Sequence, residues 1–366
     1  MFKLNKISNK SQARLGVLTT ARGKVNTPFF MPIATKAALK SCTVQEVKDL
    51  GAEIILSNTY HNYLRPGMDV IKKHGNLHQF MDCDLPILTD SGGYQVFSLS
   101  NLRKIKGDQV EFQSHIDGSK HILNPKKVID IQIVLNSDIM MILDECIGLP
   151  AKRQDAIKAL ERTTRWAEIA FDYKNKLNKK SKIIKKQLIF GIVQGADFKD
   201  LRHQSAAELM KFDFDGFAIG GLAVGEPNKV MYKVLDYTTP VLPSDKPRYL
   251  MGVGYPENII EAVKRGVDMF DCVIPTREAR HGKLYIRTGK IGNRKFYETI
   301  NITNAKFAKD KTLLAKGRFG RYSLAYMHHL FKTQEPLGLR LASLNNLAFY
   351  MDLMADIRAA IKAGKL

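Results

Sequence analysis

Two aspartates follow apolar runs that lie far apart in the sequence, and together they could carry out glycosyl transfer. Asp90 lies in the segment TDSGGYQVF and Asp271 in MFDCVIPTR. Such a reaction uses one carboxylate as nucleophile and a second as general acid and base. The pair Gly92 and Gly93 beside Tyr94 allows a flat ligand to approach the main chain closely. A tight turn capped by its own polar side chains explains the same glycines equally well.

A second set of polar residues could recognise a nucleobase. Asp144 offers an anionic acceptor and the Gln194 amide both donates and accepts, which suits the hydrogen-bonding edge of a guanine-like base. The segment GGLAVGEP adds exposed backbone groups and Glu226. Tyr94 and Met251 are candidates for packing on the two faces of that base. Ordinary core filling is the simpler explanation of Met251.

These residues need a scaffold that brings distant segments together, and the sequence has the pattern of repeated βα units. Short apolar runs alternate with amphipathic stretches of helical periodicity. The alternation predicts an α/β protein with a (β/α)8 barrel. The helical stretches include residues 124–137, 154–173, 200–212 and 256–266. The eight apolar runs begin at Phe29, Glu53, Pro86, Ile139, Leu188, Gly216, Arg248 and Met269.

Polar residues follow these runs where such a fold would use them. In a (β/α)8 barrel the working groups lie at the carboxyl ends of the strands and in the loops after them. Turn preferences alone explain any one of these residues, but their presence at six of the eight runs favours a shared site. The residues concerned are Asn58, Asp90, Asp144, Glu145, Gln194, Gly220, Gly221 and Asp271.

The alternation of apolar runs with helical stretches ends after about residue 276. We expect residues 1–276 and 338–366 to form the barrel with a closing C-terminal helix, and residues 277–337 to form an appended subdomain. The basic segment 174–186, KNKLNKKSKIIKK, is expected to be a solvated connection.

Charge and composition point to a polyanionic partner. The 366 residues carry 57 Lys and Arg against 36 Asp and Glu, a formal net charge of +21, so nucleic acid is the first partner to consider. A lysine-rich composition that has no functional meaning would explain this net charge equally well. No apolar run is long enough to cross a bilayer and no signal peptide is evident, so we expect a cytoplasmic protein. The four cysteines, Cys42, Cys83, Cys146 and Cys272, have no paired spacing and are expected to be reduced.

The order of the motifs resembles one family closely. The segments NTYH, LRPG, TDSGGYQVFSL, LDEC, GIVQG, GGLAVGE, YLMGVG and FDCVIPTR follow one another over nearly the whole chain. The chain resembles bacterial tRNA-guanine transglycosylases, the queuine tRNA-ribosyltransferases, whose fold is an irregular TIM barrel. The resemblance implies exchange of guanine at the wobble position of tRNAs with GUN anticodons for 7-aminomethyl-7-deazaguanine (preQ1), in queuosine biosynthesis. It also implies that Asp271 is the nucleophile at the ribose C1′ and Asp90 the general acid and base.

The same resemblance assigns further residues. Arg277 and Arg280 match contacts to the tRNA anticodon loop, while Cys146 and Val224 match the pocket of the form that uses the small precursor. Leu222 through its carbonyl, together with Glu226, would receive the aminomethyl ammonium. The implied base-binding set is Ser91, Tyr94, Asp144, Gln194, Gly221, Leu222, Glu226 and Met251.

The sequence departs from the family in its C-terminal segment. The family holds one zinc ion through a CxCxxC motif and a later His, and the matching positions here are Leu314, Lys316, Phe319 and Asn345. None of these is a good zinc ligand, so we expect no metal and no other cofactor. His328 and His329 are expected to be structural or interfacial rather than metal ligands. A homodimer through Tyr322, Tyr326 and His329 is expected by analogy.

Two other functions remain open. One is a catalytically silent RNA-binding paralogue, a class expected to lack Asp90 or Asp271, both of which are present. The other is a relative acting on another base or on DNA, because Glu278 and His281 replace residues that are commonly asparagine in the family.

Overall fold

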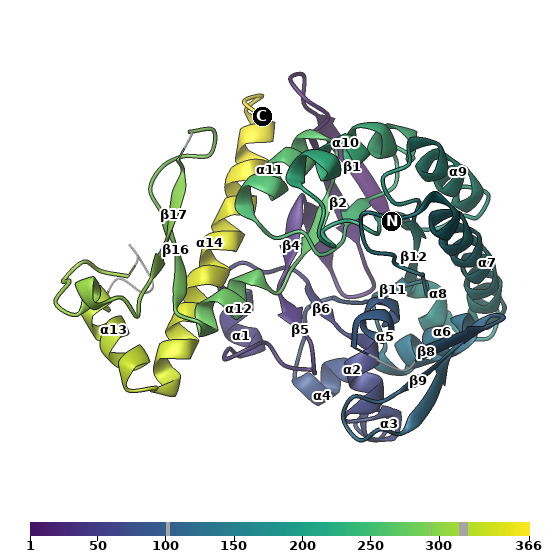
Figure 1. The fold of residues 1–366 in the computed structure, drawn as a ribbon, viewed down its shortest axis with the longest axis horizontal. Helices are drawn as coiled ribbons and strands as arrows, with labels where there is room; N and C mark the ends of the chain where they lie inside the picture. Colours follow the sequence, from purple (N-terminus) through teal and green to yellow (C-terminus); the bar gives the residue numbers. More distant parts are fainter. Residues whose placement is uncertain (100–102, 294, 315–320) are drawn as a thin grey trace.

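The central feature of the computed structural model is a nine-stranded parallel sheet that curls into a barrel (Figure 1). The model describes residues 1–99, 103–293, 295–314 and 321–366. β4 pairs with β15 and β5 pairs with β6, and only Pro32 separates β4 from β5. These two short strands therefore occupy one of eight barrel positions, and the predicted (β/α)8 fold is confirmed. The barrel strands are β4 (Phe29–Met31), β5 (Ile33–Ala34), β6 (Ile55–Ser57), β7 (Ile87–Thr89), β11 (Ile139–Met141), β12 (Leu188–Val193), β13 (Gly216–Ile219), β14 (Arg248–Leu250) and β15 (Met269–Asp271).

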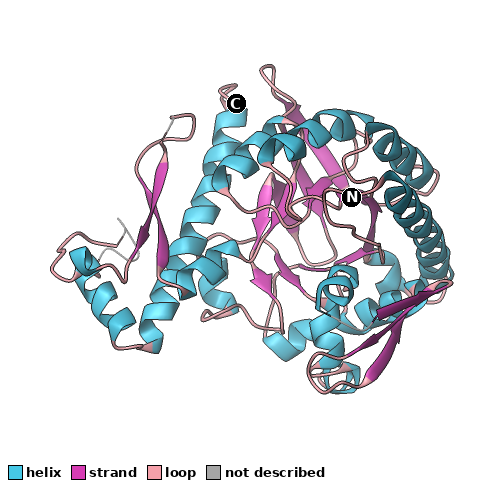
Figure 2. Ribbon diagram, in the orientation of Figure 1, coloured by secondary structure: helices cyan, strands magenta, loops and turns pink. Residues whose placement is uncertain are grey.

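Every predicted apolar run contains one of these strands. Except for Ile33, all their residues are buried, as is typical of parallel strands covered on both faces. Helices ring the barrel in Figure 2, and all of those named below except α8 place apolar residues in its core. They include α1 (Val44–Asp49), α2 (Thr59–Leu64), α3 (Met68–Lys73), α4 (Leu77–Met81), α5 (Gly93–Leu99), α6 (Pro125–Leu135), α7 (Arg153–Asn178), α8 (Lys182–Lys186), α9 (Lys199–Leu209), α10 (Asn228–Thr238), α11 (Pro256–Lys264) and α12 (Ile274–Arg280).

Three small antiparallel sheets were not predicted from the sequence. The first, β1 (Phe2–Ile7), β2 (Arg14–Thr19) and β3 (Lys24–Thr27), leads into β4. It contacts the amino ends of barrel strands, because Arg22 Nη1 lies 3.0 Å from Asp138 Oδ1 and Asn26 Nδ2 donates to Glu53 Oε1 at 2.9 Å. The N-terminal sheet thus covers that end of the barrel. The others are β8 (Arg103–Lys106), β9 (Gln109–Gln113) and β10 (Lys120–Leu123), and the hairpin of β16 (Lys283–Arg287) and β17 (Tyr297–Asn301).

A second hydrophobic cluster lies in the C-terminal part of the chain, apart from the barrel core. It contains Leu284 of β16, Met327 of α13 (Leu324–Lys332) and Leu341 of α14 (Pro336–Lys362). In Figure 1, α13 and the β16–β17 hairpin lie on the side of α14 away from the barrel. The long helix α14 therefore serves both cores, with Leu353 and Ile357 packed in the barrel core. It begins at Pro336, two residues before the closing segment expected from the sequence.

The basic segment 174–186 is largely exposed, as the sequence suggested, but most of it is helical. It comprises the last residues of α7, a short turn and α8. Lys174 is buried, with Nζ 3.4 Å from Asn178 Oδ1. Lysine is a good helix former, and its apolar stem can pack while the ammonium reaches a polar group. Among the described residues, no helix has the length and apolar character needed to span a membrane.

Candidate active site

The carboxyl ends of the barrel strands surround a cavity of 590 Å³. Its lining includes three carboxyl groups, of which Asp144 and Asp271 are buried and Asp90 is half-buried. They follow or end β7, β11 and β15, so segments up to 181 residues apart in sequence meet here because parallel strands end on one side of the barrel. Two aspartates selected from the sequence for joint chemistry therefore share one cavity.

Asp90 is held by the segment that follows β6. Thr59 donates its backbone N–H to Asp90 Oδ1 at 2.9 Å, and Asn58 Nδ2 donates to Oδ2. Burial, together with the charges of Asp271 and Asp144, raises the pKa of Asp90 to about 7 despite the opposing hydrogen bonds. At neutral pH this carboxyl group is available in both protonation states, as an acid and base must be.

Asp271 has a different set of partners. It is the last residue of β15, and its Oδ1 accepts from the Tyr249 hydroxyl at 2.6 Å and the Gly252 N–H at 2.8 Å. Burial raises the pKa of Asp271, and these two donors oppose that rise. Hydrogen bonds from Tyr249 and Gly252 favour the carboxylate, which is the nucleophilic form.

Asp144 and Gln194 form a hydrogen-bonded edge beside the two aspartates. Gln194 Nε2 donates to Asp144 Oδ2 at 2.8 Å, and the Ser91 hydroxyl donates to Oδ1 at 3.2 Å. Burial raises the pKa of Asp144 to about 6. Gln194 is itself buried behind the lining and reaches the cavity through this contact. A Cβ at Gly93 would lie 2.8 Å from the Asp144 carbonyl oxygen, so glycine is required there for close packing rather than for a turn alone.

The loop after β13 forms another wall. The Ala223 and Val224 N–H groups donate to Glu226 Oε1 and Oε2 at 2.5 and 2.9 Å. Because a trans peptide directs its C=O and N–H to opposite sides, the Leu222 carbonyl points away from Glu226. Leu222 and Cys146 line the cavity together with Val224. Burial raises the pKa of the Cys146 thiol to about 12, so this side chain is neutral.

The remaining predicted contacts lie at the mouth of the cavity or outside it. Tyr94, Met251 and Arg277 line the cavity, and Tyr94 is 53% exposed. Arg280 lies outside the lining. Together with burial and Lys36, its charge lowers the pKa of Lys40, which shows that cations gather near this side.

Sequence reasoning missed the partners of the two catalytic candidates. Asn58 was expected only as a strand-end residue, and its contact with Asp90 depends on two neighbouring strands, β6 and β7. Tyr249 lies inside a buried apolar strand, and therefore its sequence context resembles that of a core residue. Thr59 and Gly252 act through backbone N–H groups, which no residue-type pattern identifies.

The residues at the expected zinc positions do not suit a metal ion. Leu314 is buried in the second hydrophobic cluster, and its side chain has no donor atom. Asn345 Nδ2 donates to the Tyr285 carbonyl and to Asn346 Oδ1, both at 3.1 Å. Lys316 and Phe319 lie outside the described residues. Within the described ranges, no group of three or more His, Cys, Asp or Glu side chains is arranged to hold a metal.

The histidines and tyrosines singled out near this segment take ordinary positions. His328 Nδ1 lies 2.7 Å from the Ile302 carbonyl oxygen, while His329 is exposed. The rings of Tyr322 and Tyr326 stack with centroids 5.9 Å apart. All four cysteines are free thiols.

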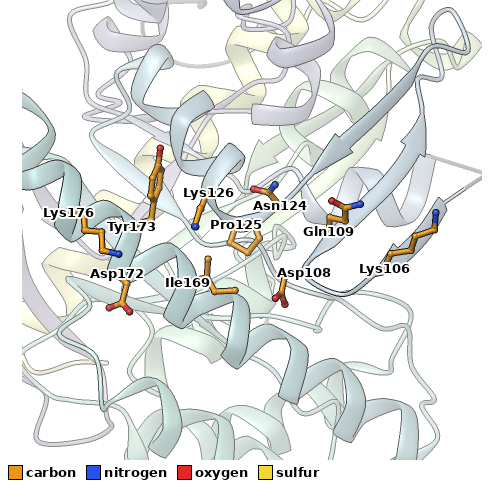
Figure 3. Close-up of a pocket in the computed structure, with 10 residues that line it drawn as sticks. All are labelled: Lys106, Asp108, Gln109, Asn124, Pro125, Lys126, Ile169, Asp172, Tyr173 and Lys176. Atoms are coloured by element: carbon orange, nitrogen blue, oxygen red, sulfur yellow. The ribbon is translucent and has the colours of Figure 1, made fainter.

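A second cavity, of 450 Å³, lies between α6, α7 and the β8–β9 hairpin (Figure 3). It contains none of the residues selected from the sequence. Of its two carboxylates, Asp108 pairs with Arg165 at 2.5 Å, and its lysines lie at the surface. The chemistry is therefore concentrated in the cavity at the carboxyl ends of the barrel strands.

Comparison with known proteins identifies relatives over the full chain. A family model described as queuine tRNA-ribosyltransferase matches residues 9–366. The queuine tRNA-ribosyltransferase of Desulforamulus reducens is 50% identical over 369 residues, covering 100% of this chain and 95% of the relative. Those of Pelotomaculum thermopropionicum and Thermoanaerobacter pseudethanolicus are 49% and 50% identical, each over 100% of this chain and over 95% and 94% of their own lengths.

Proposed function

The chain belongs to the queuine tRNA-ribosyltransferase family, and from this we propose that it replaces guanine-34 in tRNAs with GUN anticodons by preQ1. These tRNAs are those for Asp, Asn, His and Tyr, and the reaction is a step of queuosine biosynthesis in the cytoplasm. The observation that carries the proposal is that Asp90 and Asp271 line one cavity with the base-reading candidate Asp144.

In the first half-reaction, an Asp271 carboxylate oxygen attacks the ribose C1′. The bond between C1′ and the ring nitrogen of guanine breaks, and the electron pair leaves with the base. Asp90 in its protonated form gives a proton to that nitrogen, so neutral guanine departs and the ribose is left esterified to Asp271.

In the second half-reaction, Asp90 acts in its ionised form. It removes the ring proton of the incoming base, whose nitrogen then attacks C1′ while the ester bond to Asp271 breaks. Two displacements at the same carbon retain its configuration. The reaction needs no redox cofactor and no nucleoside triphosphate.

The polar edge of the cavity would select the base. Asp144, Gln194 and the Gly221 backbone would bind the purine edge, and the Leu222 carbonyl, directed away from Glu226, would accept from the aminomethyl ammonium. Cys146 and Val224 leave less room than glycine would, which favours the small preQ1.

The tRNA must present an extruded nucleotide to this cavity. Tyr94 at the mouth and Met251 within it would pack against the base, and Arg277 and Arg280 would hold the anticodon loop through phosphate and base edges. We propose further that the protein forms a homodimer through Tyr322, Tyr326 and His329, and that it binds no zinc.

Incorporation of radiolabelled guanine into an unmodified tRNA-Tyr transcript tests the proposal. The wild-type protein should incorporate label, Asp271→Asn should not, and the control Asp245→Asn, which alters an exposed turn, should match the wild type. Intact mass spectrometry should show a protein–tRNA adduct that preQ1 releases. A folded wild type that binds tRNA without incorporating label would instead be a silent RNA-binding paralogue. Label appearing only in a DNA competitor would identify a different nucleic-acid substrate.

A further inference from the structure

Arg202 of α9 lies fully buried behind the wall of the cavity, although the mechanism above gives it no role. Its donors reach main-chain carbonyls only: Nε donates to Ala196 at 2.7 Å, and Nη1 donates to Val193 at 3.0 Å and Gly220 at 2.7 Å. Nη2 has no hydrogen-bond partner among the described residues. Burial lowers the pKa of Arg202 to about 10, so the guanidinium remains charged at neutral pH.

Burying a cation without a carboxylate partner lowers the stability of the fold. Arg202 is therefore expected to have a role that compensates for this cost. Within the described part of the chain, Arg202 takes part in no ion pair. Val193 ends β12 and Gly220 directly follows β13. The guanidinium therefore fastens together the carboxyl ends of two neighbouring barrel strands, at the level where the cavity begins.

The bond to Gly220 also fixes the direction of the next backbone donor. In a planar trans peptide, the N–H of Gly221 points opposite to the carbonyl of Gly220. Arg202 holds that carbonyl on the buried side, so the Gly221 N–H is directed to the opposite side, and Gly221 lines the cavity. Gly221 has φ +65°, so this peptide adopts a conformation that glycine allows.

The same helix supports the neighbouring base-reading side chain. The Gln194 backbone N–H donates to the Ser205 hydroxyl at 3.1 Å, and Ser205 lies three residues after Arg202 on α9. Cβ atoms at Gly220 and Gly221 would lie 2.6 and 2.7 Å from the Gln194 amide. Arg202, the glycine pair and Gln194 are thus packed as one unit against Asp144.

We propose that Arg202 is a positioning residue for base recognition, holding the Gly220–Gly221 peptide so that the Gly221 N–H faces the bound nucleobase. This inference rests on the proposed base exchange. Because the guanidinium acts behind the base and away from the tRNA-binding mouth, its loss should weaken use of the free base and leave use of the tRNA largely unaffected.

Steady-state exchange of radiolabelled guanine into tRNA-Tyr tests this role with Arg202→Gln, Arg202→Lys and Arg202→Ala. We expect the KM for guanine to rise about 10- to 100-fold, the effect of losing a hydrogen bond to a charged group, while the KM for tRNA stays within about twofold. Guanidinium ion should partly restore guanine use by Arg202→Ala, whereas ethylammonium at the same concentration should not. The control is Arg153→Ala, which removes an exposed arginine paired with Asp200 at the start of α9.

Circular dichroism and thermal unfolding would establish which variants are folded. A folded Arg202→Gln or Arg202→Lys with the wild-type KM for guanine would overturn the inference, as would equal increases in the KM values for guanine and tRNA. If Arg202→Gln and Arg202→Lys were unfolded, a folded Arg202→Ala that guanidinium does not rescue would overturn it. Failure of the wild type to exchange guanine would overturn the proposed function first, and this inference with it.

Discussion

Asp90 and Asp271 line the same cavity, and their different partners suit them to different roles. Asp271 accepts from a tyrosine hydroxyl and a backbone N–H at 2.6 and 2.8 Å. Asp90 also accepts hydrogen bonds, but the charges of two neighbouring aspartates add to the effect of its burial. Environments of this kind allow one carboxyl group to remain ionised while its neighbour keeps a proton.

The rate of guanine release should depend on the ionisation of Asp90. The raised pKa of about 7 means that this acid keeps its proton up to neutral pH. Release needs the protonated form, so the single-turnover rate of adduct formation should fall as the pH rises through about 7. Asp144→Asn removes one of the like charges and should move this fall to lower pH. A rate that stays constant from about pH 6 to 9 in both proteins would contradict the role of Asp90.

Removal of the Tyr249 hydroxyl should affect Asp271. In Tyr249→Phe, Asp271 keeps the Gly252 N–H but loses a donor that lowers its pKa. Adduct formation at neutral pH should slow by about 10- to 100-fold, because a hydrogen bond to a charged group is lost. The fall in the rate of adduct formation at low pH, where Asp271 becomes protonated, should move to higher pH. Tyr173→Phe is the matched control, since that tyrosine donates to Asp130 at 2.8 Å outside the cavity, and its rate should be unchanged.

The sequence predicts the acidic residues of the site better than their partners. Asp90, Asp144 and Asp271 are detectable because a carboxylate directly after or within an apolar run is unusual. Tyr249 is amphipathic and common in buried strands, so its contact with Asp271 becomes evident only from the pairing of β14 with β15. Arg202 lies in an amphipathic helix, where an arginine is normally expected on the solvent side.

At the scale of elements, all eight barrel positions are predictable because buried parallel strands are continuous apolar runs. The small antiparallel sheets are not predictable in this way. In β1, for example, no residue is fully buried, and the strand carries Lys3 and Lys6. β8–β10 is similarly rich in charge. Their stability depends on pairing with neighbours, a property that a window of sequence does not contain.

The start of α5 offers a test of how closely an element supports the base pocket. In Gly93→Ala, the new Cβ would lie 2.8 Å from the Asp144 carbonyl oxygen and 3.2 Å from its Oδ1. The KM for guanine should rise by about tenfold or more with little change in the melting temperature. Gly148→Ala is the control, because its Cβ would meet nothing within 4 Å. Identical guanine kinetics in the two variants would show that the pocket tolerates the displacement.

At the scale of the whole molecule, α14 joins two hydrophobic cores. Leu314, at a position where the resemblance would place a zinc ligand, instead packs in the second core. We therefore propose that apolar packing, and not a metal, stabilises this part of the molecule, so that truncating Leu314 would leave a destabilising cavity.

Chelator treatment should leave this protein unchanged. After dialysis against EDTA, the melting temperature and the rate of guanine exchange should equal those before treatment, and elemental analysis should find no stoichiometric zinc in the untreated protein. A drop in melting temperature that zinc reverses would show that the C-terminal segment holds a metal by other ligands.

Two adjacent leucines test the apolar alternative. Leu314 is 2% exposed and Leu313 is 51% exposed. Leu314→Ala should lower the free energy of unfolding by about 2–5 kcal/mol, and Leu313→Ala by much less. Denaturant unfolding measures both. Equal losses would mean that Leu314 packing does not hold this part of the molecule.

The N-terminal sheet, bound to the amino ends of the barrel strands, also constrains the order of events. The reactive carboxylates lie at the opposite end, where the carboxyl ends of the strands surround the cavity. The departing guanine and the arriving base must therefore use the same cavity entrance. The two bases then take turns, and free guanine should compete directly with its replacement. Steady-state kinetics should accordingly give parallel double-reciprocal lines, as expected for a ping-pong reaction in which guanine leaves before the replacement base binds.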